Sequence, residues 1–174
     1  VVSFRILPNG SLARLNSSSI RGMRGCHLCT DEEDKYVFVS GYHDGKTTVL
    51  NLNPDGSVGK IVDGVFDRGY GSVAERNFRP HVTCTRRMPD NRFVLSVDNG
   101  IDQVKIYSFN DKEQKLVQVD AIRCDLESAP RHFRYSKDGK FIYLMYELKK
   151  AIEVSTYKTG DRAPVIEKSQ TIST

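Results

Sequence analysis

Arg131, His132 and Glu147 are the residues of this sequence whose types and spacing could best carry out chemistry. Arg131 and His132 open a short apolar stretch, and Glu147 closes a second one after a turn at Lys137-Asp138-Gly139. This pattern predicts a β-hairpin, which brings the two outer ends of its strands to one edge of a sheet. A guanidinium, an imidazole and a carboxylate at one edge could bind an oxyanion and move a proton.

The composition is that of a globular protein that can form a core. Of the 174 residues, 39% are hydrophobic and 28% are charged. No apolar run approaches the roughly 18 residues that a bilayer span needs, so we expect no membrane partner. The net charge of +4 suits a small anionic ligand but is too small to predict binding to nucleic acid.

The four cysteines do not predict a disulfide framework in a chain of this length. Cys26 and Cys29 form a CxxC pair, which raises a zinc or redox interpretation. No second CxxC occurs, and the pair lies in a strand-like run, so we predict no metal and no cofactor. The chain starts Val-Val-Ser-Phe-Arg without a signal-peptide pattern, so we expect a piece that begins inside a fold. Reduced thiols without an export signal favour the cytoplasm.

Short strand patterns separated by turns recur through the whole chain, with no helical periodicity. The pattern repeats at roughly fifty residues, with about four strands in each unit, which is typical of the blades of a β-propeller. A β-sandwich is the alternative, because turns every roughly 8–12 residues fit both folds. His27, His81 and His132 are each expected to open the first strand of a unit.

The predicted fold class is therefore all-β, a β-propeller segment of about three four-stranded antiparallel blades. Residues 1–174 would form a single partial domain, with a remnant of a preceding blade at 1–20 and blades at about 25–65, 79–122 and 129–170. Residues 63–79 are expected to form a long loop, and residues 170–174 to start another connection. Arg86 and Arg87 are expected to lie in a solvated loop.

Seven short runs together resemble the seven-bladed propeller lactonase family, which includes 6-phosphogluconolactonases and carboxy-muconate lactonising enzymes. They are Cys-His-Leu at 26–28, Gly-Tyr-His-Asp-Gly at 41–45, Arg-Pro-His-Val at 79–82, Pro-Asp-Asn-Arg-Phe-Val at 89–94, Asp-Asn-Gly-Ile-Asp at 98–102, Pro-Arg-His-Phe at 130–133 and Tyr-Glu-Leu at 146–148. Each run is weak alone, but all seven occur in the family's order with similar spacing.

The resemblance implies a fold of about twice this length, so three blades would form an open arc of a seven-bladed ring. Open sheet edges would need cover, and two copies could associate through them. The resemblance also implies a site at one mouth of the central channel. His81, Arg131 and Glu147 match residues that act on substrate in the family. His27, Asp98 and His132 match residues that surround and bind it.

Two positions depart from the family pattern. Where the family commonly reads His-x-His, this sequence reads His81-Val82-Thr83, which removes a candidate acid or base. Gly41 stands where the family often has Asn. Structural roles also stay open, since Arg131 and Glu147 could form an ion pair that ties strands together. Asp98 could cap a turn.

The resemblance and the residues together predict a lactonase-like hydrolase that acts on an anionic sugar lactone such as 6-phosphogluconolactone. Glu147 or His132 would be the base, Arg131 would bind the oxyanion or an anionic group, and His81 would supply a proton. A carboxy-muconate cycloisomerase is one alternative, and a non-catalytic propeller that binds a ligand or protein is another.

Overall fold

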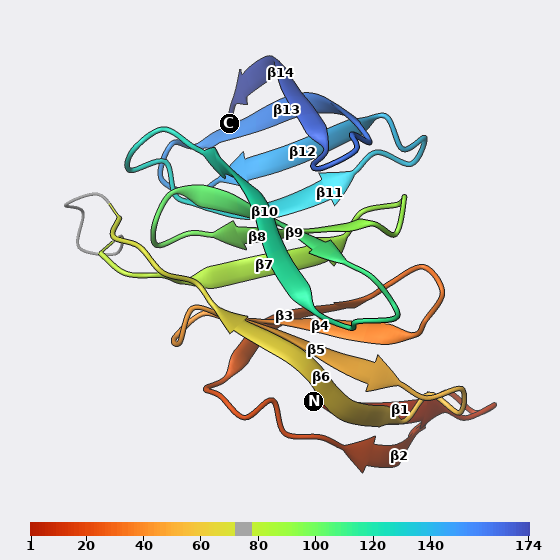
Figure 1. Ribbon diagram of the computed structural model, residues 1–174. Coiled ribbons are helices and arrows are strands. Elements are labelled where there is room, and N and C mark those ends of the chain that lie inside the picture. Colours follow the sequence, from red (N-terminus) through yellow and green to blue (C-terminus); the bar gives the residue numbers. More distant parts are fainter. Residues whose placement is uncertain (72–77) are drawn as a thin grey trace.

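The computed structural model describes residues 1–71 and 78–174 as an all-β structure, drawn in Figure 1. These residues contain fourteen strands and no helix. It follows that no described helix has the length and apolar character needed to cross a membrane. The prediction of an all-β propeller segment is confirmed by three four-stranded antiparallel sheets and one small sheet.

The strands follow one another in chain order within each sheet. The small sheet contains β1 (Val2–Ile6) and β2 (Leu12–Ser17). Sheet one contains β3 (Gly25–Thr30), β4 (Tyr36–Gly41), β5 (Lys46–Leu52) and β6 (Val58–Phe66). Sheet two contains β7 (Val82–Arg87), β8 (Phe93–Asp98), β9 (Gln103–Phe109) and β10 (Leu116–Arg123). Sheet three contains β11 (Pro130–Tyr135), β12 (Phe141–Tyr146), β13 (Ala151–Lys158) and β14 (Val165–Ser173).

The turn between β11 and β12 shows why the chain reverses where the sequence predicts. Gly139 has a φ of +69°, which L side chains rarely adopt, and its amide donates to the carbonyl of Ser136. The Asp138 carboxylate accepts from the amide of Lys140, as an Asx-type turn requires. The turn therefore sets the pairing of Phe133 with Leu144, and of the residues on either side of that pair.

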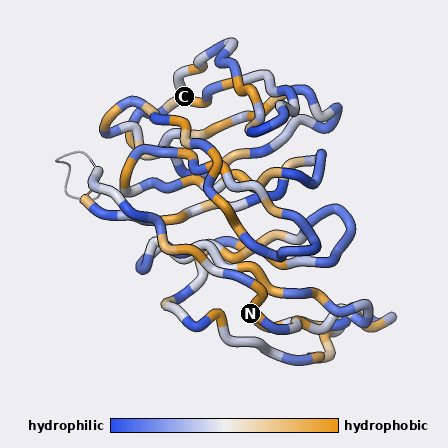
Figure 2. The backbone as a smooth tube through the Cα atoms, in the orientation of Figure 1, coloured by the Kyte–Doolittle hydropathy of each residue, from blue (hydrophilic) through white to orange (hydrophobic). Residues whose placement is uncertain are grey.

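The three large sheets are stacked in chain order, from sheet one to sheet three (Figure 1). β7 contacts β3 and β4 of the sheet before it, and β11 contacts β7 and β8. The first strands of successive sheets are thus neighbours, as on the inner side of a propeller arc. Figure 2 shows that hydrophilic residues are concentrated in the turns at the ends of the sheets.

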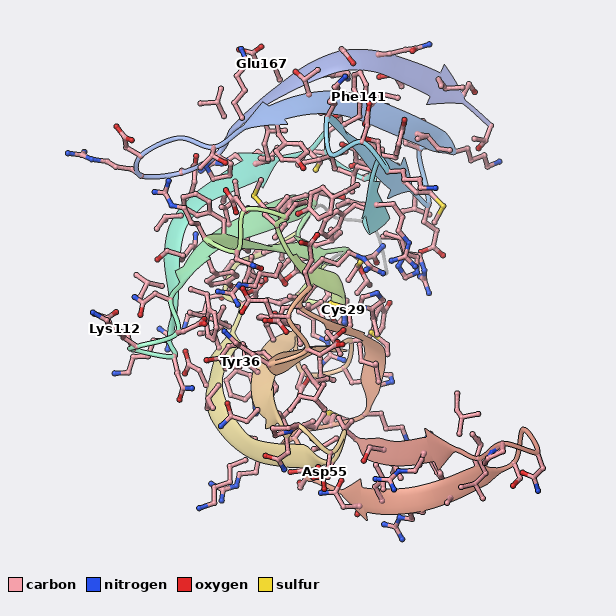
Figure 3. All side chains as sticks on the ribbon, turned by 90° about the vertical axis from the view of Figure 1, so that its right-hand side faces the viewer. Cys29, Tyr36, Asp55, Lys112, Phe141 and Glu167 are labelled. Carbon is pink, nitrogen blue, oxygen red and sulfur yellow. The ribbon has the colours of Figure 1, made fainter. Side chains whose placement is uncertain are left out.

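Apolar side chains from facing sheets fill the spaces between them, and Figure 3 shows these layers from the side. Between sheets two and three, the buried cluster includes Cys84, Phe93, Leu95, Val97, Ile106, Phe133, Ile142 and Leu144. Between sheets one and two, it includes Tyr36, Phe38, Val49, Val94, Tyr107 and Phe109. Sheet two contributes to both clusters, because Phe93 and Leu95 face sheet three while Val94 between them faces sheet one.

Two strands are longer than the sequence indicated. β6 continues to Phe66, four residues into the predicted loop 63–79, because those residues pair with the start of β5. Part of that loop, residues 72–77, lies outside the described residues. β14 runs to Ser173, so the expectation that residues 170–174 begin a connection is wrong. Pairing with β13 through Ala151 and Ser173 keeps this polar segment extended.

The expectation that Arg86 and Arg87 lie in a solvated loop is also wrong. Both belong to β7. Arg87 is buried, and its guanidinium lies 3.1 Å from the Asp31 carboxylate and 3.0 Å from that of Asp111. A buried cation needs such partners because its desolvation is otherwise costly. Arg87 therefore joins sheet one to sheet two.

Candidate active site

The first strand of each large sheet carries the same irregularity. Pairing with the second strand shifts by one residue at Cys26 in β3, at Thr83 in β7 and at Arg131 in β11. Each shift is a β-bulge, which locally bends a strand and re-aims its side chains. The three bulged residues are equivalent positions of the repeat. The residues that follow the bulges, His27, Cys84 and His132, are equivalent as well.

This register corrects one prediction. His81 does not open a first strand, because β7 begins at Val82 and His81 precedes it. The residue of sheet two that corresponds to His27 and His132 is Cys84. The similar spacing of the histidines is a coincidence, because His81 precedes its strand whereas His27 and His132 follow the bulges of theirs.

Arg131 and Glu147 meet at the edge where the hairpin argument places them. A guanidinium nitrogen of Arg131 lies 2.6 Å from a carboxylate oxygen of Glu147. Glu147 follows β12 directly, and its amide donates to the carbonyl of Ala129, which precedes β11. The side chains are 40% and 33% exposed, so the pair is accessible to a ligand from solvent.

A cavity of about 450 Å³ opens beside this pair. It is lined by Arg24, Gly25, Cys26, Tyr42, His43, Thr83, Arg131 and His132. Every bulged residue of the three first strands is thus in its wall. Arg24 and Arg131 place two guanidinium groups on it, which suits an anionic ligand.

His132 is the predicted imidazole that lines this cavity. The residue is exposed overall, but partial burial of the ring, followed by the charges of Arg131 and Arg86, lowers its pKa from 6.5. The ring is therefore uncharged near neutral pH, and a ring nitrogen can accept a proton.

His81 is close to the cavity but is committed to other contacts. It is buried, and its Nδ1 lies 2.7 Å from the carbonyl oxygen of Tyr42, whose ring stacks on the imidazole at 4.3 Å. Burial lowers the pKa of His81, so the ring is neutral and Nδ1–H can donate to Tyr42. Among the described residues, the cavity wall includes Tyr42 but not His81.

Asp98 is fully buried, and its contacts are those of a turn cap. One carboxylate oxygen accepts from the amides of His81 at 2.8 Å and Gly100 at 2.9 Å. The other oxygen faces the carboxyl group of Asp67, which also accepts a hydrogen bond from the Tyr107 hydroxyl. Burial, together with the Asp67 charge, raises the pKa of Asp98 to about 8. Asp98 therefore holds a proton near neutral pH. It positions His81 by accepting a hydrogen bond from the His81 backbone amide.

His27 does not line the Arg131 cavity, although the centroid of its ring lies 5.9 Å from that of His132. It lines a smaller cavity of about 270 Å³ with Val1, Ile20, Gly25, Cys26, Leu28 and Val39. Its Nε2 lies 3.4 Å from an Arg86 guanidinium nitrogen and 3.7 Å from the Cys84 sulfur. Burial and the Arg86 charge lower the pKa of His27 to about 4.

The two thiols of the CxxC pair contact different backbone carbonyl groups and do not point to a common metal position. Cys26 Sγ lies 3.3 Å from the carbonyl oxygen of Val82, and Cys29 Sγ lies 3.0 Å from that of Thr85. Each thiol instead links β3 to the neighbouring strand β7.

Sequence reasoning did not assign Tyr42 and Thr83 to the site. Tyr42 lies in the turn that follows β4, and its ring reaches His81 only because sheets one and two are adjacent. For Thr83, the sequence indicates only that it stands where the family commonly has a histidine. Its hydroxyl donates to the carbonyl of Arg131 at 2.7 Å and so ties the bulge of β7 to that of β11. The bulge itself leaves no signal in the residue pattern.

These sheets and their shared inner edge are the blades of a β-propeller, with a cationic pocket at one end of the inner strands. The chain belongs to the family described as "Lactonase, 7-bladed beta-propeller", whose model matches residues 1–174. It is 30% identical over 158 residues to the 6-phosphogluconolactonase of Bacillus subtilis, covering 90% of this chain and 44% of that protein.

Solved structures agree with this assignment. A candidate 6-phosphogluconolactonase from Bacteroides fragilis superposes with a TM-score of 0.87 at 28% identity, covering 99% of this chain and 49% of that one. The periplasmic gluconolactonase of Pseudomonas aeruginosa, at 24% identity and a TM-score of 0.87, shares the fold; the match covers 99% of this chain and 49% of that one. The chain spans about half the length of the curated relatives it matches.

Proposed function

We propose that this chain contributes the active site of a lactonase that hydrolyses an anionic sugar lactone such as 6-phosphogluconolactone. The observation that carries the proposal is the Arg131–Glu147 pair beside His132 at one cavity. Membership of the lactonase family and the similarity to the Bacillus subtilis 6-phosphogluconolactonase support the same reaction class.

In the proposed reaction, His132 acts first as the base. Its neutral ring takes a proton from water as the water oxygen attacks the lactone carbonyl carbon. Negative charge then develops on the carbonyl oxygen, and the Arg131 guanidinium stabilises it. The ring C–O bond breaks, and the leaving alkoxide takes the proton back from the His132 imidazolium.

Glu147 and Arg24 have supporting parts in this scheme. Glu147 holds Arg131 by one guanidinium nitrogen, which leaves its other N–H groups to face the ligand. Arg24 offers a second cation in the same wall for the carboxylate or phosphate of the substrate. The predicted role of His81 as proton donor is replaced here by His132, because His81 does not line the cavity.

Substitution of Arg131 in the full-length protein tests this proposal. We expect Arg131→Ala to lower kcat/KM for 6-phosphogluconolactone by on the order of 10²–10³, and Arg131→Lys by less. Arg123→Ala is a matched control, because Arg123 is exposed on the outermost strand of sheet two. Unchanged turnover in Arg131→Ala, with turnover intact in the control, would show that Arg131 has no part in the reaction.

The pH profile tests the role of His132. A base must be uncharged, so the rate should fall as pH decreases through the pKa of His132, at a pH below 6.5. Arg131→Ala removes a charge that lowers this pKa, so any residual activity should show its acid limb at higher pH. An acid limb that is identical in His132→Gln would assign it to another group.

A non-catalytic ligand-binding propeller is the second candidate. It is favoured by Thr83, whose hydroxyl donates to a backbone carbonyl and replaces an imidazole common in the family. Calorimetry with 6-phosphogluconate, the product, distinguishes the two. Binding without any turnover of the lactone supports this alternative and contradicts the lactonase.

A further inference from the structure

His27, Cys84 and His132 form a second group of reactive side chains, at equivalent positions of three adjacent first strands. One ligand atom from each lies within 4.8 Å of the other two. The three residues come from β3, β7 and β11, far apart in the sequence. The bulge that precedes each of them aims these side chains toward a common point.

We propose that this group binds a single soft transition-metal ion, with Cu(I) as the occupant. Two imidazoles and one thiolate form a set that binds copper and zinc. Bond lengths of about 2.0–2.3 Å put neighbouring ligand atoms roughly 3.3–4 Å apart. The 3.7 Å between Cys84 Sγ and His27 Nε2 already has this value.

His132 can complete the set with a small movement. Its side chain is exposed, so the ring can turn toward the other two ligands without disturbing the core. Cys84 is fully buried and His27 is half-buried, so these two are held in place by the fold. A third coordination bond from the exposed His132 leaves the ion open to solvent on one side.

The positive charge of the nearby arginines favours a monovalent ion over a divalent one. The Arg86 guanidinium lies 3.4 Å from His27 Nε2 and must withdraw when an ion binds there. Cu(I) with one thiolate carries no net charge, so the nearby arginines do not repel it. Zn²⁺ in the same set would keep one positive charge beside Arg86.

The inference does not rest on the proposed lactonase, although both use His132. A bound ion would occupy a nitrogen of His132 that the hydrolysis uses, so metal binding and proton transfer would exclude each other. The readout is therefore metal binding and not turnover.

Anaerobic titration of the full-length protein with Cu(I), in competition with a chromophoric chelator, tests the inference. The background variant Cys26→Ser, Cys29→Ser, Cys124→Ser removes the other thiols of this chain. In it we expect one Cu(I) per chain, with affinity lowered at least tenfold by Cys84→Ser, by His27→Gln and by His132→Gln. His43→Gln is the matched control, since His43 lines the nearby cavity but is outside the group.

A serine at position 84 keeps nearly the size of cysteine. His27→Gln and His132→Gln, at a half-buried and an exposed position, provide a result even if Cys84→Ser misfolds. Undiminished binding in either histidine variant would overturn the site. Zn²⁺ retained in preference to Cu(I) would overturn the choice of ion, and the absence of 1:1 binding would overturn the proposal as a whole.

Discussion

The β7–β8 and β11–β12 hairpins have the same lengths and the same bulge but opposite surroundings. Every residue of β8 is buried, whereas β12 alternates between buried and exposed positions. Sheet two has a sheet on each side, so both of its faces are covered. Sheet three is covered on the face toward sheet two. Equivalent hairpins therefore have different roles: the β7–β8 hairpin is part of the buried core, and the β11–β12 hairpin carries an accessible site.

Equivalent residues of the two hairpins show the difference directly. Thr83 corresponds to Arg131, and Arg87 corresponds to Tyr135. Thr83 and Arg87 are buried and bound to fixed partners. Arg131 is partly exposed and paired with Glu147 at the cavity. Position in the repeat sets the direction of a side chain, while the neighbouring sheet decides whether solvent reaches it.

The largest effect is expected where the covered hairpin holds a buried charge. Asp31→Ala leaves the Arg87 guanidinium without its buried partner, and breaking such a pair costs about 3–5 kcal/mol of unfolding free energy. Chemical denaturation measures the loss. Lys140→Ala, which removes an exposed ion pair on the β11–β12 turn and leaves the Asp138 turn cap in place, is the control. Equal losses in both variants would contradict the contrast between the hairpins.

A smaller loss is expected from Gly100→Ala. A Cβ at this position would collide with the carbonyl oxygen of Arg79 and come within 2.8 Å of the His81 ring. Overpacking of this kind costs about 1–3 kcal/mol. Gly10→Ala is not a clean control because its φ is +82°, so the comparison is with Gly64→Ala, where the closest atom is Cε of the flexible Lys46 side chain. A Gly100→Ala protein as stable as the wild type would show that His81 is held loosely.

The Asp98 carboxyl predicts how stability depends on pH. Its folded pKa of about 8 is above its ordinary value of 3.8, so the folded state binds the extra proton. Its contribution to stability is complete below pH 3.8 and is lost as pH rises from there through about 8. Asp98→Asn mimics the protonated form and should flatten this decline, with a gain on the order of 1 kcal/mol at pH 9. Melting temperatures across pH that decline equally in both proteins would refute this assignment.

The smallest effect on stability is expected at the open hairpin. Arg131→Ala removes a partly exposed ion pair, whose contribution is about 0–1 kcal/mol after solvent screening. The same substitution should remove most turnover, so activity and stability separate at this residue. A loss of stability as large as that of Asp31→Ala would mean that Arg131 is structural.

Local pattern predicted most of the repeat. Turns rich in Asp, Asn and Gly, with alternating apolar residues between them, located the strands. The hairpin argument also located the Arg131–Glu147 pair, because a hairpin fixes the register of residues only 16 apart in the chain. Such contacts depend on local geometry, so the sequence contains the information needed to find them.

Other features depended on how the sheets lie against one another. The order of residues reveals neither the bulges at Cys26, Thr83 and Arg131 nor the start of β7 after His81, so His81 seemed equivalent to His27 and His132. Burial of Asp98 beside Asp67 and of Arg87 beside Asp31 follows from sheet two having neighbours on both faces.

The sequence alone determined the strands, their hairpins and the family. Only the tertiary structure decided which polar residues face the cavity, which support it, and that His27, Cys84 and His132 converge. The physical reason is that strand pairing is set by neighbours along the chain, whereas exposure and long-range approach are set by the curvature of the arc and by the sheet stacked alongside.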